Sequence, residues 1–82
     1  MDEFDSAIAI YKLIIITQSG GNWEILGPKH DLDPVFQDWM ENGSLTEGRL
    51  TVRGFSDSAD RKPIQICQDR EHIVTMALLF WG

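Results

Sequence analysis

Cys67, Asp69 and His72 bring a thiol, a carboxylate and an imidazole close together in the sequence. A Cys–His pair is the minimal activated nucleophile, because the imidazole can take the thiol proton. The spacing gives it little support, since Cys67 would end a strand and His72 would lie a turn into the next element. A free cysteine usually packs as a small apolar side chain, and the sequence lacks a nucleophile elbow, a phosphate-binding glycine loop and a paired-histidine motif. We therefore expect a non-enzymatic protein with no catalytic residue.

His30, Asp31 and Asp33 offer three possible metal ligands. Asp33, however, is expected to cap a helix, and no second histidine lies at a useful spacing. The alternating pattern of an EF-hand calcium loop is also absent. A single cysteine excludes a cysteine-based zinc cluster and an internal disulfide framework within one chain. We expect no metal, no cofactor and a reducing, cytoplasmic compartment.

Acidic residues outnumber basic ones by 13 to 7 among 82 residues, which gives a formal net charge of −6. This balance argues against direct binding of nucleic acid or of an anionic membrane, because both require clustered positive charge. The longest apolar runs, at 7–16 and 73–81, are shorter than the roughly 20 residues of a membrane helix, and no basic segment of a signal peptide precedes the first. We expect one domain over residues 1–82, with an acidic, mobile N-terminus at 1–6.

Residues 7–17 favour a strand, because β-branched and aromatic side chains dominate. Both faces of this strand are apolar, so we expect it to lie centrally in a sheet. The sequence SGGN at 19–22 predicts a two-residue hairpin turn with both glycines at positive φ. That turn would pair Ile16 with Ile25 and place Trp23 on the same face. The second strand should end at Gly27-Pro28.

A helix is expected to run from Pro34 to about Asn42. Asp33 would cap its N-terminus, Pro34 would take the first helical position, and Gly43 would end it. Apolar residues recur at three- and four-residue spacing along this segment and form one face, which we expect to pack on the sheet: Leu32, Val35, Phe36, Trp39 and Met40.

The second half of the chain begins with an alternating strand at 49–55, in which Leu50 and Val52 would be buried. A polar loop at 56–62 and a short strand after Pro63 should follow. Residues 69–82 are ambiguous, because nearly every position is apolar, but good helix formers favour a helix.

With that helix, the expected fold is α+β, a small four-stranded antiparallel sheet with two helices on one face (ββαββα). With a C-terminal strand instead, the fold has five strands and one helix. A single layer of helices would leave one apolar face of the sheet uncovered. A second copy or a partner protein could cover that face.

Acidic residues concentrate on the expected helix and beside it, at Asp31, Asp33, Asp38, Glu41 and Glu47. Asp38 and Glu41 lie in the helix's C-terminal half, where the helix dipole and mutual repulsion disfavour carboxylates by about 0.3–1 kcal/mol. This placement favours a negative stripe that binds a basic surface, such as the groove of a nucleic-acid-binding protein. A solvated face that keeps the protein in solution is the competing explanation.

We therefore expect a protein-binding domain that inhibits or modulates a larger protein by occupying its basic or apolar surface. Asp31, Asp38, Glu41 and Glu47 would supply charge and Trp23 an apolar anchor. In size and charge the chain resembles small acidic inhibitors of nucleic-acid enzymes, including those that phages make against host defences, although no motif carries the resemblance. The alternative is a structural or regulatory subunit that homodimerises through an apolar sheet face.

Overall fold

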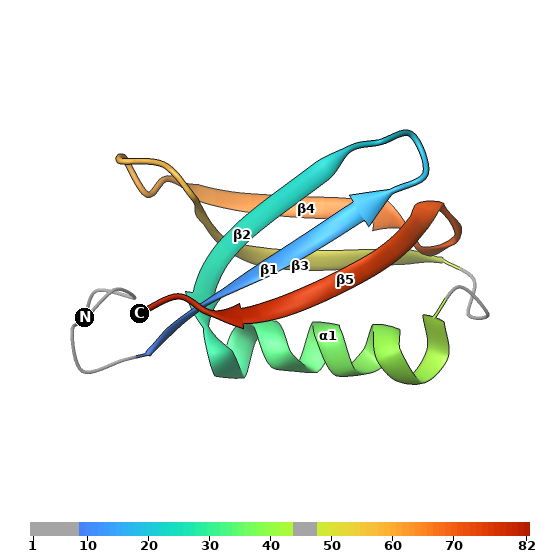
Figure 1. Ribbon diagram of the computed structural model, residues 1–82, viewed down its shortest axis with the longest axis horizontal. Coiled ribbons are helices and arrows are strands. Elements are labelled where there is room, and N and C mark those ends of the chain that lie inside the picture. Colours follow the sequence, from blue (N-terminus) through green and yellow to red (C-terminus); the bar gives the residue numbers. More distant parts are fainter. Residues whose placement is uncertain (1–8, 44–47) are drawn as a thin grey trace.

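The computed structural model describes residues 9–43 and 48–82, which form one antiparallel sheet and one long helix (Figure 1). The strands are β1 (Ile10–Thr17), β2 (Asn22–Pro28), β3 (Arg49–Ser56), β4 (Pro63–Asp69) and β5 (Ile73–Phe80), in the spatial order β4-β3-β2-β1-β5. Within the described residues the helices are α1 (Lys29–Asn42) and the short 3-10 helix η2 (Arg70–His72). The fold is α+β, in the five-strand, one-helix arrangement that the sequence left open. The N-terminal segment at 1–6 lies outside the described residues.

The preferred expectation of four strands and two helices (ββαββα) is wrong, because the last segment forms β5. This strand pairs antiparallel with β1, from Tyr11 opposite Phe80 to Thr17 opposite Ile73. Helix propensity is a weak preference that tertiary context overrides. As a helix, this segment would be apolar on nearly every side and would need burial all round. As a strand it buries Ile73 and Met76 and leaves one face to be covered.

The β1–β2 hairpin forms where it was expected, but the two-residue turn is wrong. The Thr17 amide donates to the Gly21 carbonyl at 3.0 Å, and the Gly20 amide donates to the Thr17 carbonyl at 3.0 Å, which encloses a three-residue loop. Gly20 has a φ of 87°, whereas Gly21 has no positive φ. Gly21 is instead required for close approach, since a Cβ there would lie 2.7 Å from the Thr17 hydroxyl oxygen.

The longer loop changes the register of the hairpin. Ile15 pairs with Trp23 and Leu13 with Ile25, while Ile16 lies opposite Asn22 instead of Ile25. This register differs from the expected one by three residues, and an odd shift exchanges the two faces of a strand. Ile16 therefore points away from the face that carries Trp23 and Ile25.

Helix α1 ends where it was expected but begins earlier. Gly43 follows the last helical residue with a φ of 55°. The helix starts at Lys29, directly after β2, so Asp33 is not its cap and Pro34 lies inside it. Pro34 removes one backbone hydrogen bond, but the early start brings Leu32 fully into the core. Burial of a leucine side chain contributes about 1.5–3 kcal/mol and favours the longer helix.

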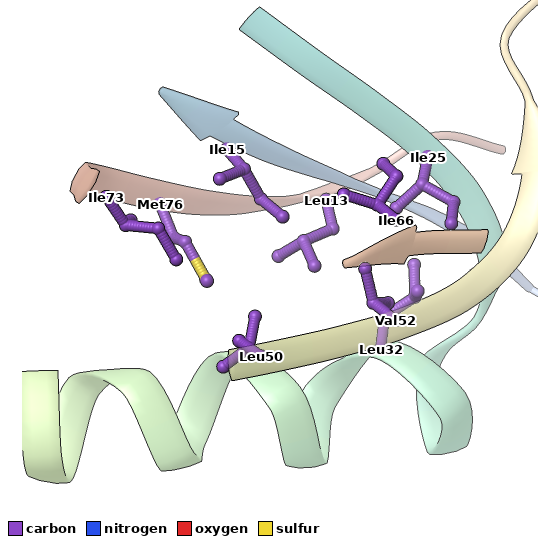
Figure 2. Close-up of a cluster of buried hydrophobic side chains, with 9 residues drawn as sticks. All are labelled: Leu13, Ile15, Ile25, Leu32, Leu50, Val52, Ile66, Ile73 and Met76. Atoms are coloured by element: carbon purple, nitrogen blue, oxygen red, sulfur yellow. The ribbon is translucent and has the colours of Figure 1, made fainter. Parts of the chain in front are cut away.

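The core lies between the two halves of the sheet and α1. Strands β2 and β3 share only two residue pairs, Ile25–Ser56 and Leu26–Phe55. The β5-β1-β2 half and the β3-β4 half therefore diverge from this corner, and α1 runs along the open side (Figure 1). All five strands and α1 contribute to one cluster of buried side chains (Figure 2), namely Leu13, Ile15, Ile25, Leu32, Leu50, Val52, Ile66, Ile73 and Met76.

Strand β1 lies between β2 and β5, which confirms its expected central place. Its alternate residues Leu13 and Ile15 face the core and are fully buried. Lys12, Ile14 and Ile16 point to the opposite side of the sheet, which we call the outer face. Within the described residues, α1 packs on the core side of the sheet and no helix covers the outer face.

Candidate functional site

The two edges of the sheet differ in how they are protected. Strand β4 forms one edge, begins with Pro63 and carries Gln65, Gln68 and Asp69. Proline and polar residues on an edge strand discourage pairing with another chain. Strand β5 forms the other edge, and its sequence IVTMALLF contains neither a charged residue nor a proline. No described strand pairs with its free side, so β5 offers an unprotected row of backbone donors and acceptors.

Apolar side chains on the outer face lie beside this free edge. A β-bulge near the start of β5 leaves Val74 without a partner in β1, and its side chain is 55% exposed. Leu79 and Ile16 are also exposed, at 46% and 39%. We define the β5 surface as the free backbone edge of β5 together with its outer-face neighbours Ile14, Ile16, Val74, Ala77 and Leu79. An edge strand and half-exposed apolar side chains thus share one region.

Two exposed aromatic side chains at the end of β5 lie on opposite faces of the sheet: Phe80, opposite Tyr11, is on the core side, and Trp81 is on the outer face. Phe80 is 66% exposed and contacts Tyr11 edge-to-face, with ring centroids 5.5 Å apart. The Trp81 ring lies 4.2 Å from the Lys12 ammonium nitrogen. Such a cation–π contact holds Trp81 against the outer face.

Lys12 is a buried cation on the otherwise apolar outer side of β1. Its ammonium nitrogen lies 2.6 Å from an Asp57 carboxylate oxygen and 2.5 Å from one of Glu24. The hydrogen bond to Asp57, followed by that to Glu24, raises the pKa of Lys12 above its usual 10.5, while desolvation acts in the opposite direction. The cluster joins β1, β2 and the loop after β3, so a charge satisfied in this way is structural.

Lys12→Met is expected to lower the free energy of unfolding at neutral pH by about 1–2 kcal/mol, because Glu24 loses the Lys12 ammonium and Asp57 keeps only Arg61, 3.8 Å away. The raised pKa means that the stabilisation from Lys12 is complete below pH 10.5 and disappears as pH rises through the folded-state value. Urea unfolding of both proteins between about pH 9 and about pH 12 should show their difference shrinking. A difference that is constant over this range would contradict the assignment.

The acidic residues expected to bind a partner divide into two groups. Asp31 and Glu41 are exposed on α1, and Asp33 contacts Gln37 at 3.5 Å. After Lys29, α1 contains no lysine or arginine, and its last turn has no basic residue. We call Asp31, Asp33 and Glu41 the acidic helix face. Glu47 lies outside the described residues.

Asp38 already has a partner within the chain. Its carboxylate accepts hydrogen bonds from the Arg70 guanidinium at 2.7 Å and from the Asn42 amide at 2.8 Å. The Arg70 hydrogen bond is the larger cause of the lowered pKa of Asp38. Arg70 is only 5% exposed and also donates to the Gly43 carbonyl at 3.2 Å. Asp38 therefore links the end of α1 to η2 through Arg70. The sequence did not predict this ion pair, because its two residues are far apart in the chain.

Trp23 is 48% exposed, as suits an anchor, but lies apart from the β5 surface. It is opposite Ile15 in β2, so its side chain is on the core side of the sheet, at the hairpin end. The β5 surface is on the outer face. Trp23 therefore cannot act together with Val74 and Leu79 on one flat partner surface.

The residues considered for catalysis are close in the chain without forming a catalytic pair. Cys67 is exposed, and its sulfur accepts a hydrogen bond from the Thr51 hydroxyl at 3.6 Å. His72 instead lies 3.8 Å from Asp69 and 3.9 Å from Glu71. Asp69, Glu71 and His72 lie close enough together to hold a cation, but Asp69 already pairs with Arg49 at 3.1 Å. None of these contacts activates a nucleophile.

Two further observations concern membrane-spanning helices and similarity to known proteins. In the described part of the chain, no helix has the length and apolar character needed to cross a membrane. Comparisons of the chain with protein-family models, with curated proteins and with solved structures found no match.

Proposed function

We propose that this chain is a non-enzymatic protein-binding domain that binds its partner through the β5 surface. The observation that carries the proposal is the difference between the two edges of the sheet. The β4 edge has proline and polar residues, whereas the β5 edge is uncharged. A long apolar edge strand is a hazard that proteins normally remove. Its retention is explained if another chain covers it.

The mode of binding follows from the geometry of a free edge strand. An extended segment of a partner can add to β5 through backbone hydrogen bonds, and the neighbouring side chains then select among sequences. Val74 and Leu79 are about half exposed and would be buried by a partner that also covers the outer face. By occupying an apolar strand or surface of a larger protein, the domain would inhibit or modulate that protein.

The acidic helix face supports a second candidate, in which the chain binds a basic surface. Asp31 and Glu41 are exposed, and α1 has no lysine or arginine beyond Lys29. Electrostatic complementarity of this kind raises the rate of association and is weakened by salt. Asp38 contributes less than the sequence suggested, because Arg70 neutralises it.

Capture experiments with three immobilised proteins separate the two candidates. The baits are the wild type, a β5 variant carrying Val74→Glu and Leu79→Glu, and a helix variant carrying Asp31→Lys and Glu41→Lys. Each is exposed to an extract of cells that carry the gene, and retained proteins are purified and remeasured by calorimetry. The proposal predicts a partner that binds the wild type and the helix variant but binds the β5 variant at least about 30-fold more weakly.

Capture of a protein by the wild type does not by itself support either candidate. The difference in binding among the three baits distinguishes them. A partner lost only from the helix variant, and weakened by salt, would replace the proposal with the second candidate. A partner retained equally by all three baits would overturn both. Circular dichroism of the two variants must show an unchanged fold, which is expected because all four substituted side chains are exposed.

A further inference from the structure

We infer that the strand added to β5 is β5 of a second copy of this chain, arranged antiparallel about a two-fold axis. The inference rests on the proposed function, since it concerns the same surface: the second copy covers β5 in the isolated protein and competes there with the larger partner. Two-fold dimers are the commonest protein assemblies, and their interfaces must be complementary to themselves. Pairing of β5 with its copy would join two five-stranded sheets into one continuous sheet and remove both free edges.

The alternation of side chains restricts the register of this pairing. Residues opposite each other in antiparallel strands must point to the same face. Beyond the bulge, Thr75, Ala77 and Leu79 point outward, and Met76 and Leu78 point to the core side. Opposite residues must therefore be separated by an even number of positions. The two-fold axis then passes through one residue of β5, which lies opposite its own copy.

Ala77 is at the centre of the regular stretch Thr75–Leu79, and its small side chain can lie against its own copy. An axis at Ala77 places Thr75 opposite Leu79 of the second copy and Met76 opposite Leu78 of the second copy. Every one of these pairs matches in face. The bulge at Val74 ends the regular pairing on one side.

The chain has a net charge of −6, so long-range repulsion between two copies is reduced by salt, and the charges near the paired strands matter most. Strand β5 carries no charge. The cation nearest the strand in sequence register, Lys12, is neutralised by Glu24 and Asp57. Self-pairing of β5 therefore brings no like charges opposite each other.

The exposed apolar area suits a modest interface. Val74 and Leu79 are 55% and 46% exposed in the single chain, and pairing of two β5 strands would cover both residues in each copy. Interfaces made by one edge strand and a few side chains fall toward the lower end of the size range for specific complexes. We therefore expect a reversible dimer with a Kd in roughly the micromolar range.

Light scattering coupled to gel filtration tests the inference over loading concentrations from about 1 μM to about 500 μM. The wild type should change from monomer to dimer across this range. The variant with Val74→Glu and Leu79→Glu should need concentrations at least about 100-fold higher than the wild type to dimerise, because pairing would gather four carboxylates at one edge. Met40→Glu is the matched control, since Met40 is 57% exposed but lies on α1; this control should dimerise like the wild type.

A cysteine probe tests the same axis in a protein with an intact β5 surface. In a Cys67→Ser background, Ala77→Cys should form a disulfide-linked dimer under mild oxidation, because the two-fold axis places residue 77 beside its copy within disulfide range. Met40→Cys in the same background should remain unlinked. This arm keeps the inference testable if the double glutamate variant does not fold.

Each outcome has a definite meaning. A wild type that is monomeric at every concentration, and an Ala77→Cys chain that remains unlinked, would overturn the inference. The proposed function would survive that result if a different protein still bound in a manner dependent on Val74 and Leu79. A dimer that is unaffected by the double glutamate substitution would overturn the inference and place self-association on another surface.

Discussion

Ile15→Asp is expected to abolish folding, whereas Ile16→Asp, one residue further along the same strand, is expected to leave the chain folded. Ile15 is fully buried in the core cluster and Ile16 is 39% exposed on the outer face. A carboxylate at position 15 has no cation among the surrounding apolar side chains (Figure 2). Burying it, and losing the isoleucine packing, costs at least about 4 kcal/mol, which is most of the stability of a small domain.

Ile16→Asp removes an apolar group that is already partly in water, so the expected cost is about 1 kcal/mol or less. Far-ultraviolet circular dichroism and urea unfolding of both variants at neutral pH provide the measurement. Equal loss of structure in the two variants would mean that both faces of β1 are buried. The assignment of Ile16 to an exposed part of the outer face would then be wrong.

Gly54→Ala is expected to destabilise the domain by about 2–4 kcal/mol, because β3 and β2 approach each other too closely for a side chain there. A Cβ at position 54 would collide with the Leu26 carbonyl oxygen and lie 2.8 Å from the Ile25 Cγ1 atom. Backbone cannot move aside as a flexible side chain can. This collision falls where the two halves of the sheet join through only two residue pairs.

Gly43→Ala is the control for the loss of a glycine. Gly43 has a φ of 55° and a ψ of −140° with open space around its Cβ position, so its substitution meets no neighbouring atom and costs about 1–2 kcal/mol through backbone strain alone. Urea midpoints of the two variants should therefore fall in the order wild type, Gly43→Ala, Gly54→Ala. A Gly54→Ala protein as stable as the Gly43→Ala protein would contradict the close β2–β3 junction.

The sequence predicted the elements whose signals are local. The alternation of Leu50 and Val52, the apolar density of β1 and the glycine after α1 all correspond to observed features. Each depends on neighbours within a few residues, so physical rules for strands and helix ends apply directly.

The predictions from the sequence were wrong where contacts between residues far apart in the chain determine the structure. Strand β5 forms because β1 accepts a partner on each side, which no rule applied to residues 69–82 alone could show. The early start of α1 depends on the core position of Leu32. The hairpin register depends on the contact between Thr17 and Gly21. Helix propensity and turn statistics are weaker than these contacts.

The candidate site was anticipated only in part. An uncovered apolar sheet face was expected, but only part of the outer face is exposed, at Ile16, Val74 and Leu79, whereas Ile10, Lys12 and Leu26 on the same face are buried. The acidic residues were weighted more heavily because sequence reasoning cannot see that Arg70 lies beneath Asp38. The edge position of β5 could not be predicted either, because it depends on the pairing of β5 with β1.

Hydrogen–deuterium exchange at low and at high protein concentration tests most directly whether β5 pairs with a second copy of the chain. The account predicts that the amides of Ile73–Phe80 on the free side of β5 exchange more slowly in the concentrated sample, because they become hydrogen-bonded to another chain. Amides of α1 should exchange at the same rate in both samples. Protection that appears on α1 or β4 while β5 is unchanged would contradict the account.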